Sequence, residues 1–160
     1  MRNIYLLIFV LFSFHSVGKE YYIDEYEFKW VVTEFSGASL AVIKTDETTY
    51  LRLTTKGSAY KQLRLTEHEA KELSIALQKT REYFNEQKGT TKDVSAKLMA
   101  AEYEVSFSSS PKYGFSVYIR KKSGSLFDSI ILDKAEAIGL QPYFEQAEEL
   151  INFVDTKIKI

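Results

Sequence analysis

The chain contains two stretches that share one order of hydrophobic and polar positions. In each stretch, short segments that alternate apolar and polar residues precede a longer segment whose apolar residues recur every three or four positions. The first pattern is typical of strands with one buried face, and the second of a helix with one apolar stripe. The stripe of the first helix is Leu73, Leu77, Thr80 and Phe84, and that of the second is Leu140, Phe144, Ala147 and Ile151.

The two stretches align with a shift of 67 residues. Eight of the 29 pairs from Gly57 to Asn85 are identical, whereas average residue usage gives roughly two. We interpret this as an internal duplication. The repeats cover about 26–87 and 102–156, and we expect both to belong to a single compact domain of residues 19–160.

The alternating segments predict the strands of each repeat. Thr66 and Asp133 are placed as N-caps of the two helices. Residues 85–101 begin as a polar stretch and end in residues with better helix than strand propensity, so we expect a loop with a short irregular element there. Pro142 predicts that the second helix is kinked or begins at that residue. The expected strands are 26–35, 40–44, 50–54 and 59–65 in the first repeat, and 103–107, 115–121 and 126–132 in the second.

These elements predict an α+β fold. The expected architecture is a mainly antiparallel sheet from two tandem copies of a β-meander followed by an α-helix. Both helices lie on one sheet face, because each copy alone would leave its apolar face half covered.

The other face of the sheet is predicted to be aromatic and basic. Tyr50-Leu51-Arg52 and Tyr118-Ile119-Arg120 stand at matching places of the two repeats, with the Tyr and Arg side chains pointing away from the helices. Such a face can bind a ligand by stacking and by guanidinium contacts. Tyr beside Arg is also an ordinary pairing on a solvated sheet, which is the alternative. The candidate ligand-binding residues are Tyr50, Arg52, Tyr60, Arg64, Tyr118 and Arg120.

Charge adds to this picture through its distribution. The chain has 21 basic and 22 acidic residues, so its overall charge does not favour binding to nucleic acid or an anionic membrane. The two helices carry most of the glutamates. We expect an acidic helical side and a basic sheet side, the latter with Lys44, Arg52, Lys56, Arg64, Lys112, Arg120, Lys121 and Lys122.

The N-terminal sequence MRNIYLLIFVLFSFHSVG has the three parts of a secretory signal peptide. Arg2 supplies the positive charge, residues 4–12 form the apolar run, and residues 16–18 are small. We expect residues 1–18 to be a signal peptide and the rest to be exported, periplasmic or secreted, in a bacterium. An uncleaved signal anchor is the alternative; after cleavage we expect no membrane span. The chain has no cysteine, so the exported domain must be stable without disulfides.

Residues that carry common catalytic chemistry are scarce. Outside the signal peptide, His68 is the one histidine, and no Gly-x-Ser-x-Gly motif occurs. We therefore expect no catalytic residues, no metal site and no cofactor, and a protein that is not an enzyme. Folding can still bring two carboxylates together, which leaves a carboxylate-based hydrolase of envelope polymers as a third hypothesis.

The order of four strands and a helix, present twice, resembles the topology of Whirly and purine-rich-element-binding domains. Those domains hold single-stranded nucleic acid on sheet faces, so the resemblance implies this function as an alternative on the same face. Export argues against nucleic acid as a partner. The first hypothesis is an exported, non-enzymatic binding or interaction module whose partner is a protein or an anionic or aromatic ligand.

Overall fold

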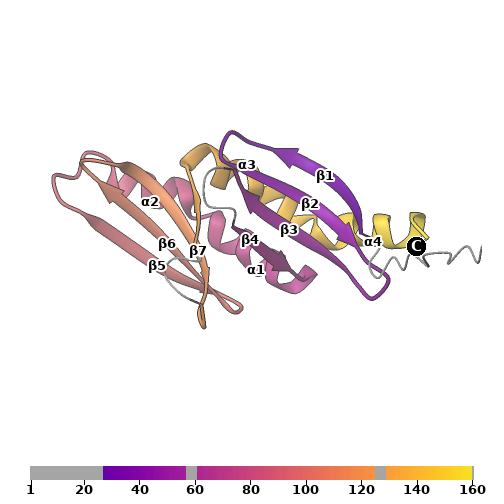
Figure 1. Ribbon diagram of the computed structural model, residues 1–160. Coiled ribbons are helices and arrows are strands. Elements are labelled where there is room, and N and C mark those ends of the chain that lie inside the picture. Colours follow the sequence, from indigo (N-terminus) through magenta and orange to yellow (C-terminus); the bar gives the residue numbers. More distant parts are fainter. Residues whose placement is uncertain (1–26, 57–60, 125–128, 160) are drawn as a thin grey trace, which may run out of the picture.

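The computed structural model describes residues 27–56, 61–124 and 129–159. Within these residues the chain forms eight strands and four helices, in an order that occurs twice (Figure 1). The first repeat contains β1 (Phe28–Glu34), β2 (Ala38–Lys44), β3 (Thr49–Thr55), β4 (Gln62–Leu65), α1 (Glu67–Leu77) and α2 (Thr80–Gln87). The second contains β5 (Val94–Ala100), β6 (Tyr103–Ser110), β7 (Gly114–Lys121), β8 (Ile130–Leu132), α3 (Lys134–Glu145) and α4 (Ala147–Lys157).

The predicted α+β class and the tandem meander-and-helix units are confirmed. The described strands form two four-stranded antiparallel sheets, with the orders β1-β2-β3-β4 and β5-β6-β7-β8, rather than one continuous sheet. We call these the first and second sheets. The helices α1 and α2 carry the chain away from β4 before β5 begins, so the second meander builds its own sheet (Figure 1).

The prediction of an irregular loop in residues 85–101 was wrong. Its first residues end α2, and β5 pairs with β6 over its whole length, from Val94 with Ser109 to Ala100 with Tyr103. The strand is at the edge of its sheet, and most of its side chains are not buried. Its backbone hydrogen bonds to β6 therefore outweigh the weak strand propensity of its residues.

The helices connect the two repeats. α1 packs against α3, α2 packs on β6 and β7 of the second sheet, and α4 packs on β2 and β3 of the first sheet. Each repeat thus covers the other repeat's sheet with its last helix (Figure 1). Most of the buried apolar residues of both repeats belong to one hydrophobic cluster, which includes Leu51, Leu73, Val117 and Leu140.

Both predicted N-caps are present, and each belongs to a reciprocal capping box, Thr66 with Glu69 and Asp133 with Glu136. Glu136 also joins the repeats, because its buried carboxylate accepts a hydrogen bond of 2.6 Å from the backbone N–H of Gly37. A Cβ at Gly37 would lie 2.8 Å from that carboxylate oxygen, so glycine permits the contact.

Pro142 neither begins nor ends the second helix. It lies inside α3, which starts at Lys134, and the helix breaks at Gln146 before α4 begins. The first repeat breaks between α1 and α2 at the corresponding place, Gln78 and Lys79, without a proline. The break therefore belongs to the shared architecture, in which the second helical segment turns toward the other repeat's sheet.

Among the described helices, none combines the length and apolar character needed to cross a membrane. The predicted signal peptide, residues 1–18, lies outside the described residues, and so does Tyr60.

Candidate functional site

The predicted site residues lie on the sheet faces opposite the helices, which we call the outer faces. Tyr50, Arg52 and Arg64 are on the outer face of the first sheet, and Tyr118 and Arg120 are on that of the second. Their side chains alternate along the strands with core residues such as Leu51 and Ile119. The structure therefore divides the candidates between two faces.

The outer face of the first sheet carries apolar side chains that are almost fully covered. Ala41, Ile43 and Tyr50 form a buried cluster separate from the main core, with exposed fractions of 3%, 0% and 6%. The Arg64 guanidinium lies 5.2 Å from the centre of the Tyr50 ring. Arg52 donates two hydrogen bonds to the Glu27 carboxylate, of 2.6 and 3.1 Å, and its side chain is 12% exposed. The apolar side chains of this face are therefore covered, and the charge of Arg52 is paired with that of Glu27.

The two Tyr-x-Arg sequences do not occupy equivalent positions. Arg52 pairs with Arg64 and Tyr118 pairs with Ile131, and the 67-residue shift aligns Arg64 with Ile131. Tyr118 therefore takes the place of Arg52, and the expectation of matching places was wrong by two residues. A two-residue offset keeps each side chain on its face but moves it one pair along the strand.

The strand register shows which residues do correspond. Ala41 pairs with Arg52 as Ser106 pairs with Tyr118, and the pair of Ile43 and Tyr50 corresponds to Ser108 and Ser116. All three buried side chains of the first outer face are thus replaced by serines in the second. Because a serine is much smaller than an isoleucine or a tyrosine, these replacements leave space above the second sheet. We call this surface the serine face; it comprises Ser95, Lys97, Glu104, Ser106, Ser108, Ser116, Tyr118 and Arg120.

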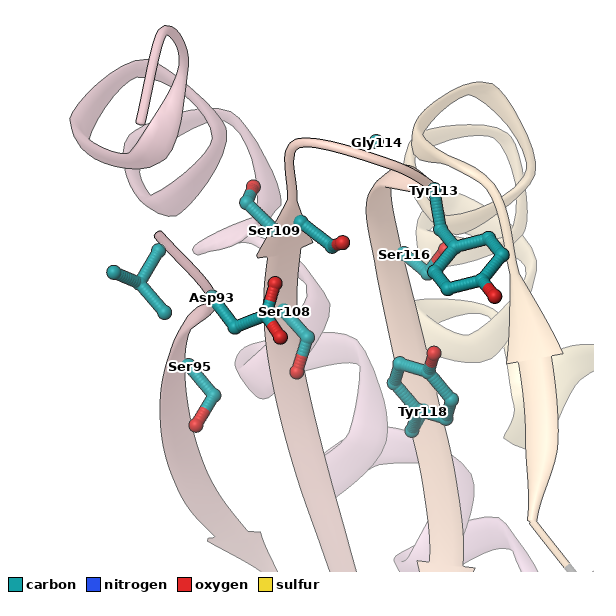
Figure 2. A pocket seen from close by; sticks show the side chains of 10 residues that line it. Asp93, Ser95, Ser108, Ser109, Tyr113, Gly114, Ser116 and Tyr118 are labelled. Carbon is teal, nitrogen blue, oxygen red and sulfur yellow. The ribbon is translucent and has the colours of Figure 1, made fainter. Parts of the chain in front are cut away.

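Two adjoining hollows occupy the serine face. One has a volume of about 350 Å³ and the other about 320 Å³, and Ser108 and Tyr118 line both. Figure 2 shows the first hollow, with Asp93 and Ser95 on one wall and the rings of Tyr113 and Tyr118 on the other. The hollows therefore form one elongated depression across β5, β6 and β7.

A charged network closes one end of this depression. The Glu104 carboxylate accepts hydrogen bonds of 3.1 and 3.2 Å from Arg120 and lies 3.2 Å from the Lys97 ammonium. Burial opposes the charged form of Glu104, but the hydrogen bonds and charges of Lys97 and Arg120 outweigh it, so the pKa of Glu104 is lowered. The network thus holds an ionised carboxylate between two cations.

The predicted basic side is largely compensated by carboxylates. Lys44 points to the helix layer, where its ammonium binds Asp155 at 2.9 Å, so it was wrongly assigned to the sheet side. Lys56 and Lys121 pair with Glu34 and Glu102 at 3.4 and 2.6 Å. A strong, uniform positive field over the sheets is therefore not present in the described part of the chain.

Carboxylates do meet on the helical side. Glu67, Glu145 and Glu148 line a hollow of about 250 Å³ between α1 and the second repeat's helices, together with His68 and Lys71. The three glutamates are exposed. The hollow therefore does not give these glutamates the burial that a general acid usually has. Among residues 27–56, 61–124 and 129–159, no group of three or more His, Asp or Glu side chains could hold a metal.

The serines were not identified from the sequence as site residues. Their signal was the alternation in VSFSSS, where Ser106 and Ser108 flank the core residue Phe107. Alternation predicts which face a serine occupies, but it does not show that its counterpart in the other repeat is large and buried. That comparison requires the register of both sheets.

No protein-family model matches this chain, and no curated protein matches its sequence.

Proposed function

We propose that this chain is an exported, non-enzymatic binding module and that its ligand binds on the serine face. The N-terminal sequence supports export, to the periplasm or the outside of a bacterial cell. The partner is a molecule or a protein segment that enters the depression between β5 and β7. Of the sequence-derived candidates, Tyr118 and Arg120 belong to this surface.

The observation that carries the proposal is the difference between equivalent positions of the two sheets. A binding site needs open, concave space lined by a few polar groups and aromatic rings. The serine face has this combination, since Ser108 and Tyr118 line two adjoining hollows and Arg120 stands at one end. On the first sheet, Ile43 and Tyr50 fill the corresponding positions.

The helical side supports a binding role rather than catalysis. The glutamates that line the hollow beside α1 are exposed to solvent, so the protein does not provide a buried environment for a general acid there. A hydrolase would need two acids with different environments facing one bound substrate. On the serine face, Asp93 and Glu104 line opposite ends of the depression, so they do not converge on one point of a bound ligand.

A fragment screen followed by amide chemical shifts tests the proposal. The probes are small polar and aromatic fragments, added one at a time to the isotope-labelled chain of residues 19–160. We expect shifts concentrated on β5, β6 and β7, and their loss in the variant Ser108→Ile, which gives the second sheet the side chain of Ile43. Shifts that concentrate elsewhere, or that persist in Ser108→Ile, would overturn the proposal.

A further inference from the structure

We infer that the serine face binds an uncharged, hydroxyl-rich chain, namely an oligosaccharide. The inference rests on the proposed function, since it assigns a ligand class to the same surface. Its basis is the shape of the depression, the chemistry of its hydroxyl groups and the internal compensation of its charges.

The depression is elongated rather than a single closed pocket. Its two hollows of about 350 and 320 Å³ share Ser108 and Tyr118, so a ligand can extend from one to the other. Asp93 and Tyr113 lie at one end, and Arg120 and Glu104 lie at the other. This geometry suits a linear ligand with at least two similar units.

The walls present hydroxyl groups that can both donate and accept hydrogen bonds. Ser95, Ser106, Ser108 and Ser116 line the hollows. A hydroxyl is one donor with two acceptor sites. Sugar hydroxyls have the same dual character, so each contact can form in either direction.

The charges of the face favour a neutral ligand. Glu104 is already held between Lys97 and Arg120, and Asp93 adds a carboxylate at the other end. A polyanion gains affinity by neutralising cations that have no carboxylate partner within the protein. Lys97 and Arg120 already have such a partner in Glu104. The paired Arg120 and Glu104 still offer charge-assisted hydrogen bonds to hydroxyl groups.

Two aromatic rings complete the surface. Tyr118 stands between the hollows, and Tyr113, 75% exposed, stands at the rim (Figure 2). Tyr rings offer a flat apolar area next to a polar tip. The C–H faces of sugar rings can pack on such an area while their edges meet the serines.

Calorimetry and amide chemical shifts with defined probes test this inference. The neutral probes are chitohexaose, maltohexaose and laminarihexaose, and the charged probes are oligo(dT) and a polyglutamate peptide. We expect at least one neutral probe to bind and shift β5–β7 amides, with affinity nearly independent of salt. Ser108→Ile should weaken it by about tenfold or more, because the larger side chain fills the space between the hollows.

The control variant is Ser123→Ile, since Ser123 lies in the exposed turn after β7. It should bind like the unmodified chain. Tyr118→Ala gives a second test should Ser108→Ile fold poorly, and circular dichroism checks that both variants are folded.

Binding of oligo(dT) or polyglutamate on β5–β7, with affinity that falls with salt, would overturn the inference while retaining the proposed function. No perturbation of β5–β7 by any neutral probe would overturn the inference, and the fragment screen then decides the proposed function separately.

Discussion

The outer faces of the two sheets differ in the side chains that they carry and in how far these are covered. On the first sheet, Ile43 and Tyr50 are buried and Arg52 is held by Glu27. On the second, Ser108 and Ser116 take the places of Ile43 and Tyr50 and line a depression. One repeat therefore uses this face for apolar packing, and the other leaves it open and polar.

The difference shows which positions of a duplicated fold can diverge. Inner positions such as Leu51 and Val117 are fully buried in the shared core, so both repeats keep an apolar residue there. Outer positions lie on the sheet faces opposite the helices. Their side chains can change from Ile to Ser without altering the ladder, because the backbone hydrogen bonds remain.

The largest predicted effect comes from opening the first outer face. Ile43→Ser gives the first sheet the residue of the second and should lower the free energy of unfolding by about 3 kcal/mol, because it removes buried apolar atoms and buries a hydroxyl. Chemical denaturation measures the change. Ile75→Ser is the control, since Ile75 is 53% exposed on α1 and its replacement should change stability by less than about 0.5 kcal/mol. A similarly small loss for Ile43→Ser would show that both outer faces are solvated alike.

An intermediate effect should separate the two arginines. Arg52→Ser removes a two-hydrogen-bond pair on a side chain that is 12% exposed, and should cost about 2 kcal/mol. Arg120 is 22% exposed and Lys97 remains to hold Glu104, so Arg120→Ser should cost about 1 kcal/mol or less. Thermal unfolding of each single variant checks this order. Equal losses would contradict it, and the double variant should be additive because the residues lie on separate sheets.

The smallest predicted effect is the pH dependence that Glu104 of the second sheet contributes. The lowered pKa of Glu104 means that its contribution to stability is present above its unfolded pKa of 4.5 and is lost as pH falls through the folded value. The corresponding residue of the first sheet is Ser39, which does not titrate. Glu104→Gln should therefore reduce the loss in free energy of unfolding between about pH 5 and pH 3. Unfolding midpoints of both proteins over this range provide the measurement, and parallel curves would argue against the network.

Much of the fold could be predicted from local patterns. The apolar stripes located both helical layers, and Thr66 and Asp133 were identified as N-caps because their side chains act on the adjacent turn. β5 was missed because its residues are poor strand formers and its partner, β6, is what makes it a strand. Pro142 was expected to kink or begin the second helix; the helix does not begin there, since Pro142 lies inside α3 and the break before α4 comes at Gln146.

Part of the candidate site could also be predicted. Tyr118 and Arg120 were assigned to an outer face by alternation alone, and they do lie there. The predicted equivalence of the two Tyr-x-Arg sequences was wrong because spacing along the chain does not determine strand register, and Tyr118 stands at the position of Arg52. The serines became visible as site residues only beside Ala41, Ile43 and Tyr50.

The amino-acid sequence by itself determined the duplication, seven of the eight described strands, the starts of α1 and α3, and the side of those strands that faces the core. These features depend on residues close together in the chain, where periodicity and capping operate. Tertiary structure decided the division into two sheets, the exchange of α2 and α4 between them, and which outer face is closed. Those outcomes depend on contacts between residues far apart in the chain, whose register no local pattern contains.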